Sequence, residues 1–245
     1  PPVVDALRAK GIQVWGWQYI YGESPLAEAN MAIHRIQQLK LDGFVINAEK
    51  EYKRTGKKDA AKRYMSHLRM ANPSIPIALS SYRYPSYHPE FPWREFLENV
   101  DINMPQVYWM HAHNPVDQLN RCVREFQTMT PSRPIIPTGA AFKEFGWKSN
   151  AEEVIDFMKA AQRQNLTAAN FWEWSHARDN NNLPGMWDAI RDYAWDQTPV
   201  QPDICQRYIN ALNTHKPGEV IKLYNPNAVH VTGSQTIQGT TVIQA

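Results

Sequence analysis

The sequence predicts an α/β protein: a (β/α)8 barrel of the TIM type that lacks its first two strands in this chain, followed by a partial α+β segment. Three observations carry this prediction. Short apolar runs alternate six times with segments of helical period between residues 1 and 195. No glycine-rich phosphate turn follows any of these runs, which counts against the rival, an open doubly wound sheet. The chain opens on a helix-like segment, 3–11, that ends at a glycine, so we expect two strands and one helix upstream.

The individual elements follow from these alternations. We expect strands over 13–19, 43–49, 76–82, 102–109, 134–140 and 169–175. We expect helices over 25–39, 58–71, 93–99, 115–129, 150–164 and 183–194. Together these elements form a barrel domain over residues 1–195.

The C-terminal part of the chain is different in composition. Residues 196–203 contain two prolines among mostly polar residues, which is typical of a linker. Residues 204–245 predict two short helices and then a strand with a turn. A segment of about forty residues does not bury a stable core alone, so it either packs on the barrel or begins a second domain.

Composition excludes several classes of function. The chain has 245 residues, 43% of them apolar, with a formal net charge of +2, and its most basic stretch, 50–62, also contains acidic residues. We therefore expect no nucleic-acid partner. No apolar run approaches the ~20 residues of a membrane span, so we expect a soluble protein. The two cysteines form no metal spacing, and His111 and His113 lack a matched third ligand, so we expect no metal and no cofactor.

The most informative stretch is FVINAEKEY, 44–52. In a strand, alternate side chains share a face. Asn47 and Glu49 therefore point to one side, and the apolar residues Phe44, Ile46 and Ala48 point to the other. The apolar face suits the helix layer, which places Asn47 and Glu49 inside the barrel at the carboxyl end of the strand, where barrel enzymes keep their catalytic groups. The alternative is structural: Glu49 pairs with a cation such as Arg83 and seals the barrel top.

The last predicted strand, FWEWS, offers a second acid. Glu173 lies between Trp172 and Trp174, and a poorly hydrated setting favours the protonated form that a general acid needs. If the two indoles face inward, however, Glu173 points to the helices. The alternative interpretation is then a core Trp pair with a buried salt bridge.

Polar and aromatic residues at the ends of the other strands complete a candidate binding rim. Carbohydrates bind by stacking on rings and by hydrogen bonding through many hydroxyls. The candidate substrate-binding residues are Trp15, Trp17, Tyr19, Glu51, Tyr82, Arg83, Gln106, Tyr108, Trp109, Trp172 and Trp174, beside the candidate catalytic residues Glu49, Glu173 and Asn47.

With these strands placed, the first ~195 residues resemble the barrel of lysozyme-type glycoside hydrolases, family 25 and its bacterial relatives. That family keeps an Asp-x-Glu pair at the end of its fourth strand, and Glu49 matches the proposed catalytic acid. Asn47 stands where the family has Asp, and an amide is no carboxylate base. Glu173 falls in a region where the family carries another acid, and a further expected Asp belongs to a first strand that this chain does not contain.

The C-terminal segment resembles the opening of a nuclear transport factor 2-like (SnoaL-like) domain. Such domains begin with two helices, an L-Y-x-x-x-A-V phrase and a G-x-x-x-I phrase, which Leu223-Tyr224, Ala228-Val229, Gly239 and Ile243 match. The resemblance covers about a third of that fold. It implies a conical pocket that binds a small apolar ligand or mediates dimers, so homo-oligomerisation through this segment is one expectation.

The resulting hypothesis is a glycan-directed barrel, a glycosidase that acts on an amino-sugar polymer such as peptidoglycan by general acid catalysis. The alternatives are a carbohydrate-binding barrel without activity, or an assembly protein that oligomerises through its C-terminal segment. The compartment is open, and a secreted or cell-surface location follows if a signal peptide precedes Pro1.

Overall fold

The structure, a computed structural model, describes residues 2–195, 204–224, 229–231 and 236–238. The chain divides into two compact units, Pro1–Gln197 and Thr198–Ala245. The predicted linker, 196–203, lies outside the described residues. None of the helices in the described ranges is both long and apolar enough to cross a membrane.

The first unit is built on one parallel sheet of six strands. The strand order is β1-β2-β3-β4-β5-β8, so neighbours in the sheet are successive strands of the β/α series. All six predicted strands are present, as β1 (Trp15–Ile20), β2 (Gly43–Ala48), β3 (Ile77–Tyr82), β4 (Ile102–Val107), β5 (Thr138–Ala140) and β8 (Asn170–Trp172).

The sheet is strongly curled. In a flat sheet of six strands the two edge strands would lie about 24 Å apart, at ~4.8 Å per step. Here the rings of Trp17 on β1 and Trp172 on β8, the two edges, have centroids only 5.9 Å apart. The predicted α/β class is therefore confirmed, in the form of a half-barrel whose concave face is enclosed by its own edges.

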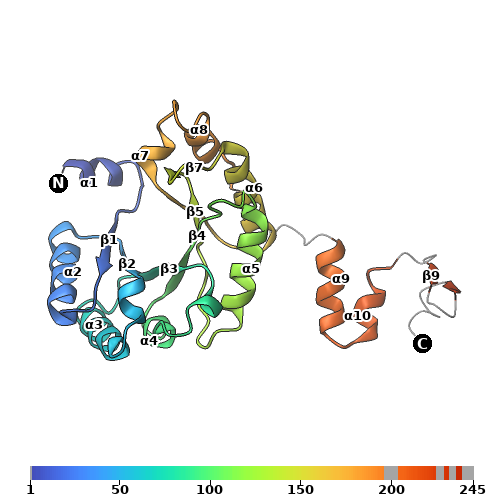
Figure 1. Cartoon of the computed structure of the whole chain (residues 1–245), viewed down its shortest axis with the longest axis horizontal. Coiled ribbons are helices and arrows are strands. Elements are labelled where there is room, and N and C mark those ends of the chain that lie inside the picture. The colour runs from blue at the N-terminus through green and yellow to red at the C-terminus, as the bar shows by residue number, and fades with distance from the viewer. Residues whose placement is uncertain (1, 196–203, 225–228, 232–235, 239–245) are drawn as a thin grey trace. The chain divides into compact units, whose positions relative to one another are not determined.

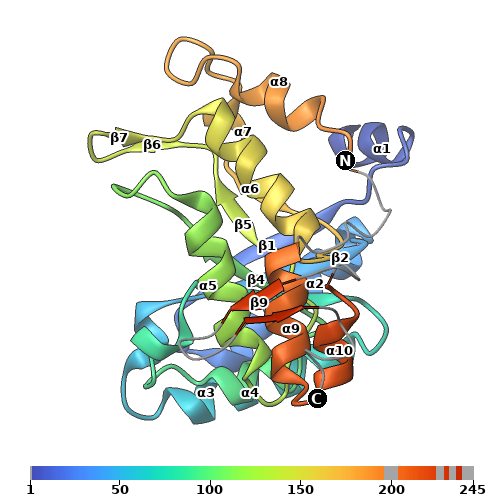
Figure 2. The ribbon, with the colours of Figure 1, turned by 90° about the vertical axis from the view of Figure 1, so that its right-hand side faces the viewer.

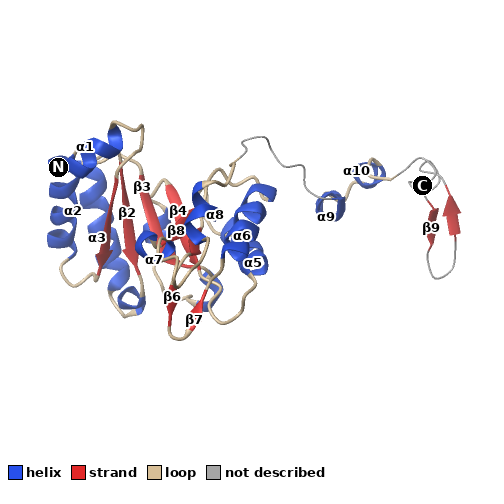
Figure 3. Cartoon of the chain, turned by 90° about the horizontal axis from the view of Figure 1, so that it is seen from above, coloured by secondary structure: helices blue, strands red, loops and turns tan. Residues whose placement is uncertain are grey.

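Helices cover the convex face of this sheet (Figure 1). They are α2 (Pro25–Leu39), α3 (Lys57–Ala71), α4 (Trp93–Leu97), α5 (Pro115–Gln127) and α6 (Ala151–Arg163), with α1 (Pro2–Arg8) before the first strand. Figure 3 shows α2 and α3 beside β1 and β2, and α5 and α6 at the other end of the sheet. Helices α2 and α3 pack together, as do α5 and α6, which is the arrangement of a β/α barrel wall.

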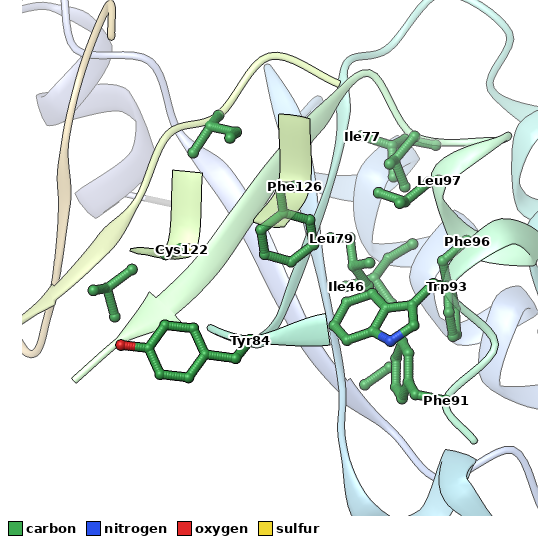
Figure 4. Close-up of a cluster of buried hydrophobic side chains, with 14 of the residues drawn as sticks. Ile46, Ile77, Leu79, Tyr84, Phe91, Trp93, Phe96, Leu97, Cys122 and Phe126 are labelled. Atoms are coloured by element: carbon green, nitrogen blue, oxygen red, sulfur yellow. The ribbon is translucent and has the colours of Figure 1, made fainter. Parts of the chain in front are cut away.

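The hydrophobic core lies between the sheet and these helices. Its strand side is formed by alternate residues such as Phe44, Ile46 and Leu79, all fully buried. Figure 4 shows Ile46, Ile77 and Leu79 facing a group of rings and aliphatic side chains that includes Phe91, Trp93, Phe96, Leu97 and Phe126. Because Phe44 and Ile46 occupy the core face of β2, the alternation of side chains along the strand places Asn47 and Glu49 on the concave side of the sheet.

The elements differ from the prediction mainly at the C-terminal end of the unit. Strand β8 stops at Trp172, and the chain turns into α7 (Trp174–Ala177), so residues 173–175 are not strand. The last helix, α8, is shorter than predicted, at Met186–Arg191. An unpredicted hairpin of β6 (Lys143–Glu144) and β7 (Trp147–Lys148) projects from the region after β5 (Figure 2). Two 3-10 turns, η1 (Lys50–Lys53) and η2 (Pro85–Tyr87), follow β2 and β3.

The second unit contains the two predicted short helices, α9 (Ile204–Asn213) and α10 (Pro217–Ile221). Strands β9 (Val229–Val231) and β10 (Thr236–Gln238) pair antiparallel. Of the residues that carry the resemblance to nuclear transport factor 2, Ala228, Gly239 and Ile243 lie outside the described residues. That resemblance stays a prediction.

Candidate active site

The concave face of the half-barrel encloses a cavity of about 610 Å³, within the usual range of small-molecule sites. All six strands of the sheet contribute to its wall. The side chains that line it come from Trp15, Trp17, Tyr19, Val45, Asn47, Glu49, Ser80, Ile102, Met104, Gln106, Tyr108, Ile136, Thr138, Asn170, Phe171 and Trp172, with Gly16. Glu49 is the one carboxylate in this lining of described residues.

The strand register places a row of polar side chains around the cavity. Asn47 pairs with Tyr19 on one side and with Ser80 on the other. Farther along the sheet, Thr138 pairs with both Gln106 and Asn170. Ser80 pairs with Met104 and Gln106 with Tyr82, so these two sets of residues lie at neighbouring levels of the wall. Because paired residues of parallel strands point to the same face, both levels supply hydroxyl and amide groups.

Gln106 joins the two residues that the sequence singles out. Its Nε2 lies 2.9 Å from Glu49 Oε1, 3.1 Å from Asn47 Oδ1 and 3.3 Å from Ser80 Oγ. An amide has two N–H donors, so Gln106 holds the carboxyl of Glu49 and the amide oxygen of Asn47 close to one nitrogen. The prediction that Asn47 and Glu49 face the interior together is met by this geometry.

The structural alternative for Glu49 is not observed. Arg83, its proposed ion-pair partner, instead donates a hydrogen bond to the carbonyl of Tyr108 and lies 5.1 Å from the ring of Tyr84. Within the described part of the chain, no cation forms an ion pair with Glu49, whose hydrogen-bond donor is Gln106. The carboxyl group is therefore open to the cavity rather than locked to a guanidinium.

A second carboxylate lies behind the wall. Glu51, in η1, is 9% exposed, and its Oε2 accepts a hydrogen bond of 2.6 Å from the hydroxyl of Tyr19. Glu51 does not line the cavity itself, whereas Tyr19 does. Glu51 therefore reaches the cavity through Tyr19.

Burial and the two carboxylates keep the nearby phenols protonated. Burial raises the pKa of Tyr82 to about 12, with the charges of Glu49 and Glu51 acting in the same direction. Burial also raises the pKa of Tyr19, together with its hydrogen bond to Glu51 and the charge of Glu49. The pKa of Tyr108 is raised by burial and then by the charge of Glu49.

Two indoles close the cavity between the sheet edges. Trp17 and Trp172 are each 45% exposed, and their planes are inclined by 36°. They lie in the cavity lining with Trp15. Exposed rings of this kind offer flat apolar faces on which a sugar can stack.

Glu173, the acidic residue of the FWEWS motif, does not line this cavity. Glu173 follows the end of β8 and caps α7, where it accepts hydrogen bonds from the backbone N–H groups of Ser175 and His176 and from the Ser175 hydroxyl. Burial works to raise the pKa of Glu173, but these hydrogen bonds outweigh it, and the pKa is lowered. The expectation of a protonated general acid at this position is therefore corrected.

Four other predicted binding residues also lie outside the cavity lining. Trp174 is 59% exposed outside the cavity, with Arg178 4.6 Å from its ring. Trp109 is fully buried, and its indole donates to Glu153 on α6, because β4 ends at Val107 and the alternation does not continue. Tyr82 stacks on His88 at 3.7 Å and, like Arg83, is absent from the described cavity lining.

The sequence reasoning missed Ser80, Thr138 and Asn170, which complete the polar row. A signal was present for Ser80. In IALSSY, Ser80 is two residues after Ala78 on the face opposite Ile77 and Leu79, and the same period of two that identified Asn47 assigns it inward.

No protein-family model matches the chain, and no curated protein matches it. Among solved structures, a chitinase from Chromobacterium violaceum is similar over 82% of this chain and 84% of its own, with a TM-score of 0.58 and 11% identity. Active domain 2 of a thermostable chitinase from Pyrococcus furiosus gives a TM-score of 0.54 at 14% identity, over 69% of this chain. This chain spans 64% of the length of that domain.

An endoglucanase from Pseudomonas stutzeri is similar to the same extent, with a TM-score of 0.55 and 11% identity over 82% of this chain and 74% of its own. At such identities the likeness shows the fold alone: the half-barrel has the β/α architecture of a TIM barrel. The resemblance to family 25 remains a prediction.

Proposed function

We propose that the chain is a glycoside hydrolase that acts on an amino-sugar polymer such as peptidoglycan or chitin, with Glu49 as the proton donor. The observation that carries the proposal is the position of Glu49, a carboxyl group at the carboxyl end of β2 that faces a cavity ringed by indoles, phenols and amides. Barrel enzymes place their catalytic groups at this end of the strands.

The chemistry requires a proton for the oxygen of the leaving sugar. Among the described residues Glu49 forms no ion pair, and it is held by Gln106, so its second oxygen can face the glycosidic oxygen. A positioned acid of this kind contributes about 10²–10⁴-fold to the rate. The glycoside-hydrolase neighbours and the Trp17–Trp172 pair support a glycan as the ligand.

The amide of Asn47 suits an amino sugar. Its Oδ1 already accepts from Gln106, which leaves its N–H groups to face the cavity and donate to a carbonyl such as that of an N-acetyl group. This polarity favours an N-acetylated sugar over a plain glucan.

The test is hydrolysis of peptidoglycan and of N-acetyl chito-oligosaccharides by the wild type and by Glu49→Gln. We expect the variant to lose at least about 10²-fold in kcat while it still binds the oligosaccharide. Glu152→Gln, an exposed residue on α6, is the matched control and should leave the rate unchanged. A Glu49→Gln variant that cleaves as fast as its parent would overturn the proposal.

A second candidate is a barrel that binds glycan without cleaving it. Two observations favour it: an amide stands at position 47, and the described cavity lining holds one carboxylate, whereas most glycosidases use two. Asn47→Asp distinguishes the candidates. If the wild type binds oligosaccharide without turnover and Asn47→Asp gains turnover, the binding role is correct.

A further inference from the structure

The inference in this subsection rests on the proposed glycosidase function and concerns the group opposite the acid. Most glycosidases pair the acid with a second carboxylate, which acts as nucleophile or as the base for water. In this cavity Glu49 has no such partner among the described residues, and Glu173 belongs to the cap of α7. Among the described residues, a protein group that attacks the anomeric carbon is therefore a side chain other than a carboxylate.

Tyr19 is the side chain best placed for this role. It lines the cavity on β1 and pairs in register with Asn47 on β2. Tyr19 and Glu49 both line the cavity, and Glu49 comes two residues after the register partner of Tyr19. Tyr19 thus lies beside the acid.

Glu51 supplies the base that a tyrosine requires. It is buried, and in the part of the chain that the structure describes its side chain makes one hydrogen bond, the 2.6 Å contact with the Tyr19 hydroxyl. Lys53, two residues later in the chain, forms its ion pair with Glu90 instead. The carboxylate of Glu51 is therefore placed to accept the phenolic proton of Tyr19.

We propose that Tyr19 is the nucleophile of the reaction and that Glu51 is its general base. A nucleophile and a base within hydrogen-bond reach, with the nucleophile open to the cavity and the base behind it, are the recognised arrangement for covalent catalysis. Tyrosine nucleophiles occur in sialidases, so the phenol is chemically able to form a glycosyl bond.

The first half-reaction forms the bond between Tyr19 Oη and the anomeric carbon as the bond from that carbon to the leaving oxygen breaks. The phenolic proton passes to Glu51, and the proton of Glu49 passes to the leaving oxygen. The pKa of Tyr19 is raised by burial and by Glu51, so the phenol is protonated in the free protein and its proton passes to Glu51 as the bond to carbon forms.

The second half-reaction hydrolyses the glycosyl-tyrosine. A water oxygen attacks the anomeric carbon and gives its proton to the Glu49 carboxylate. The bond to Tyr19 Oη breaks, and the phenol takes back its proton from Glu51. Two displacements at one carbon retain the configuration of the sugar.

The test compares Tyr19→Phe, Glu51→Gln and the control Tyr21→Phe with the wild type on N-acetyl chito-oligosaccharides and peptidoglycan. Tyr21 is 52% exposed beside Tyr19 and does not line the cavity. We expect Tyr19→Phe and Glu51→Gln to lower kcat by about 10²–10⁴-fold with KM and the thermal midpoint little changed. Tyr21→Phe should leave both constants unchanged, and the products should keep the anomeric configuration of the substrate.

The outcomes separate this inference from the proposed function. If the wild type cleaves and depends on Glu49 while Tyr19→Phe keeps its kcat, or if the products are inverted, the nucleophile is another group and the glycosidase function stands. The acetamido group of the substrate is then the first alternative. If the wild type cleaves neither polymer, the proposed function fails and this inference with it.

Discussion

The replacement Trp17→Ala tests whether the cavity binds a sugar between its two indoles. Trp17 is 45% exposed, which corresponds to roughly 110 Å² if a fully exposed indole presents about 250 Å². A pyranose stacked on one face would cover about half of that area. At ~25 cal/mol per Å², the lost contact amounts to about 1.4 kcal/mol, or a tenfold weaker Kd.

The assay is isothermal titration of an N-acetyl chito-oligosaccharide into the protein, with Glu49→Gln in both variants to prevent turnover. Trp174→Ala is the matched control, because Trp174 is 59% exposed but lies outside the cavity. We expect the Kd to rise about tenfold for Trp17→Ala and to stay constant for Trp174→Ala. Equal Kd values for Trp17→Ala and its parent, or a loss in Trp174→Ala alone, would refute the stacking argument.

Two further predictions concern stability. A Cβ at Gly43 would lie 2.3 Å from the Trp15 ring, so Gly43→Ala should reduce the free energy of unfolding in urea by about 1–3 kcal/mol; an unchanged value would mean that the ring moves freely. Burial works to raise the pKa of Asp101, but hydrogen bonds from the Ile77 backbone and Arg69 lower it. This carboxylate therefore stabilises the fold above about pH 4, and the stabilisation is lost as the pH falls through the folded pKa. Asp101→Asn should flatten the acid limb of a stability-against-pH curve, and an acid limb of unchanged slope would contradict this assignment.

The sequence was sufficient to predict the strands of the sheet and the inward direction of Asn47 and Glu49 in the wall of the site. The apolar residues Phe44 and Ile46 alternate with Val45 and Asn47, and burying one face of a strand determines the direction of the other. That rule depends only on local spacing. For this reason the inward position of Asn47 and Glu49 could be predicted without the fold.

The rule failed where a strand ended. Strand β8 stops at Trp172, so the N-terminus of α7, and not the alternation of the strand, determines the directions of the Glu173 and Trp174 side chains. Trp109 lies beyond the end of β4, and its indole bonds with Glu153, 44 positions later in the chain. Contacts of that kind depend on tertiary packing, which a window of neighbouring residues does not report.

The hydrogen-bonded pair of Tyr19 and Glu51 could be predicted only in part. The sequence identified both residues as members of the rim, but Glu51 follows β2 in a 3-10 turn, where the alternation no longer applies. The turn directs Glu51 behind the wall, and the hydrogen bond to Tyr19 becomes visible only in the structure.

The most direct test of the central claim is the structure of Glu49→Gln with an N-acetyl chito-oligosaccharide. We predict sugar rings in the concave cavity against Trp17 and Trp172, with a glycosidic oxygen about 2.6–3.2 Å from the side chain at position 49. An oligosaccharide bound elsewhere on the protein, or a glycosidic bond out of reach of position 49, would contradict the account.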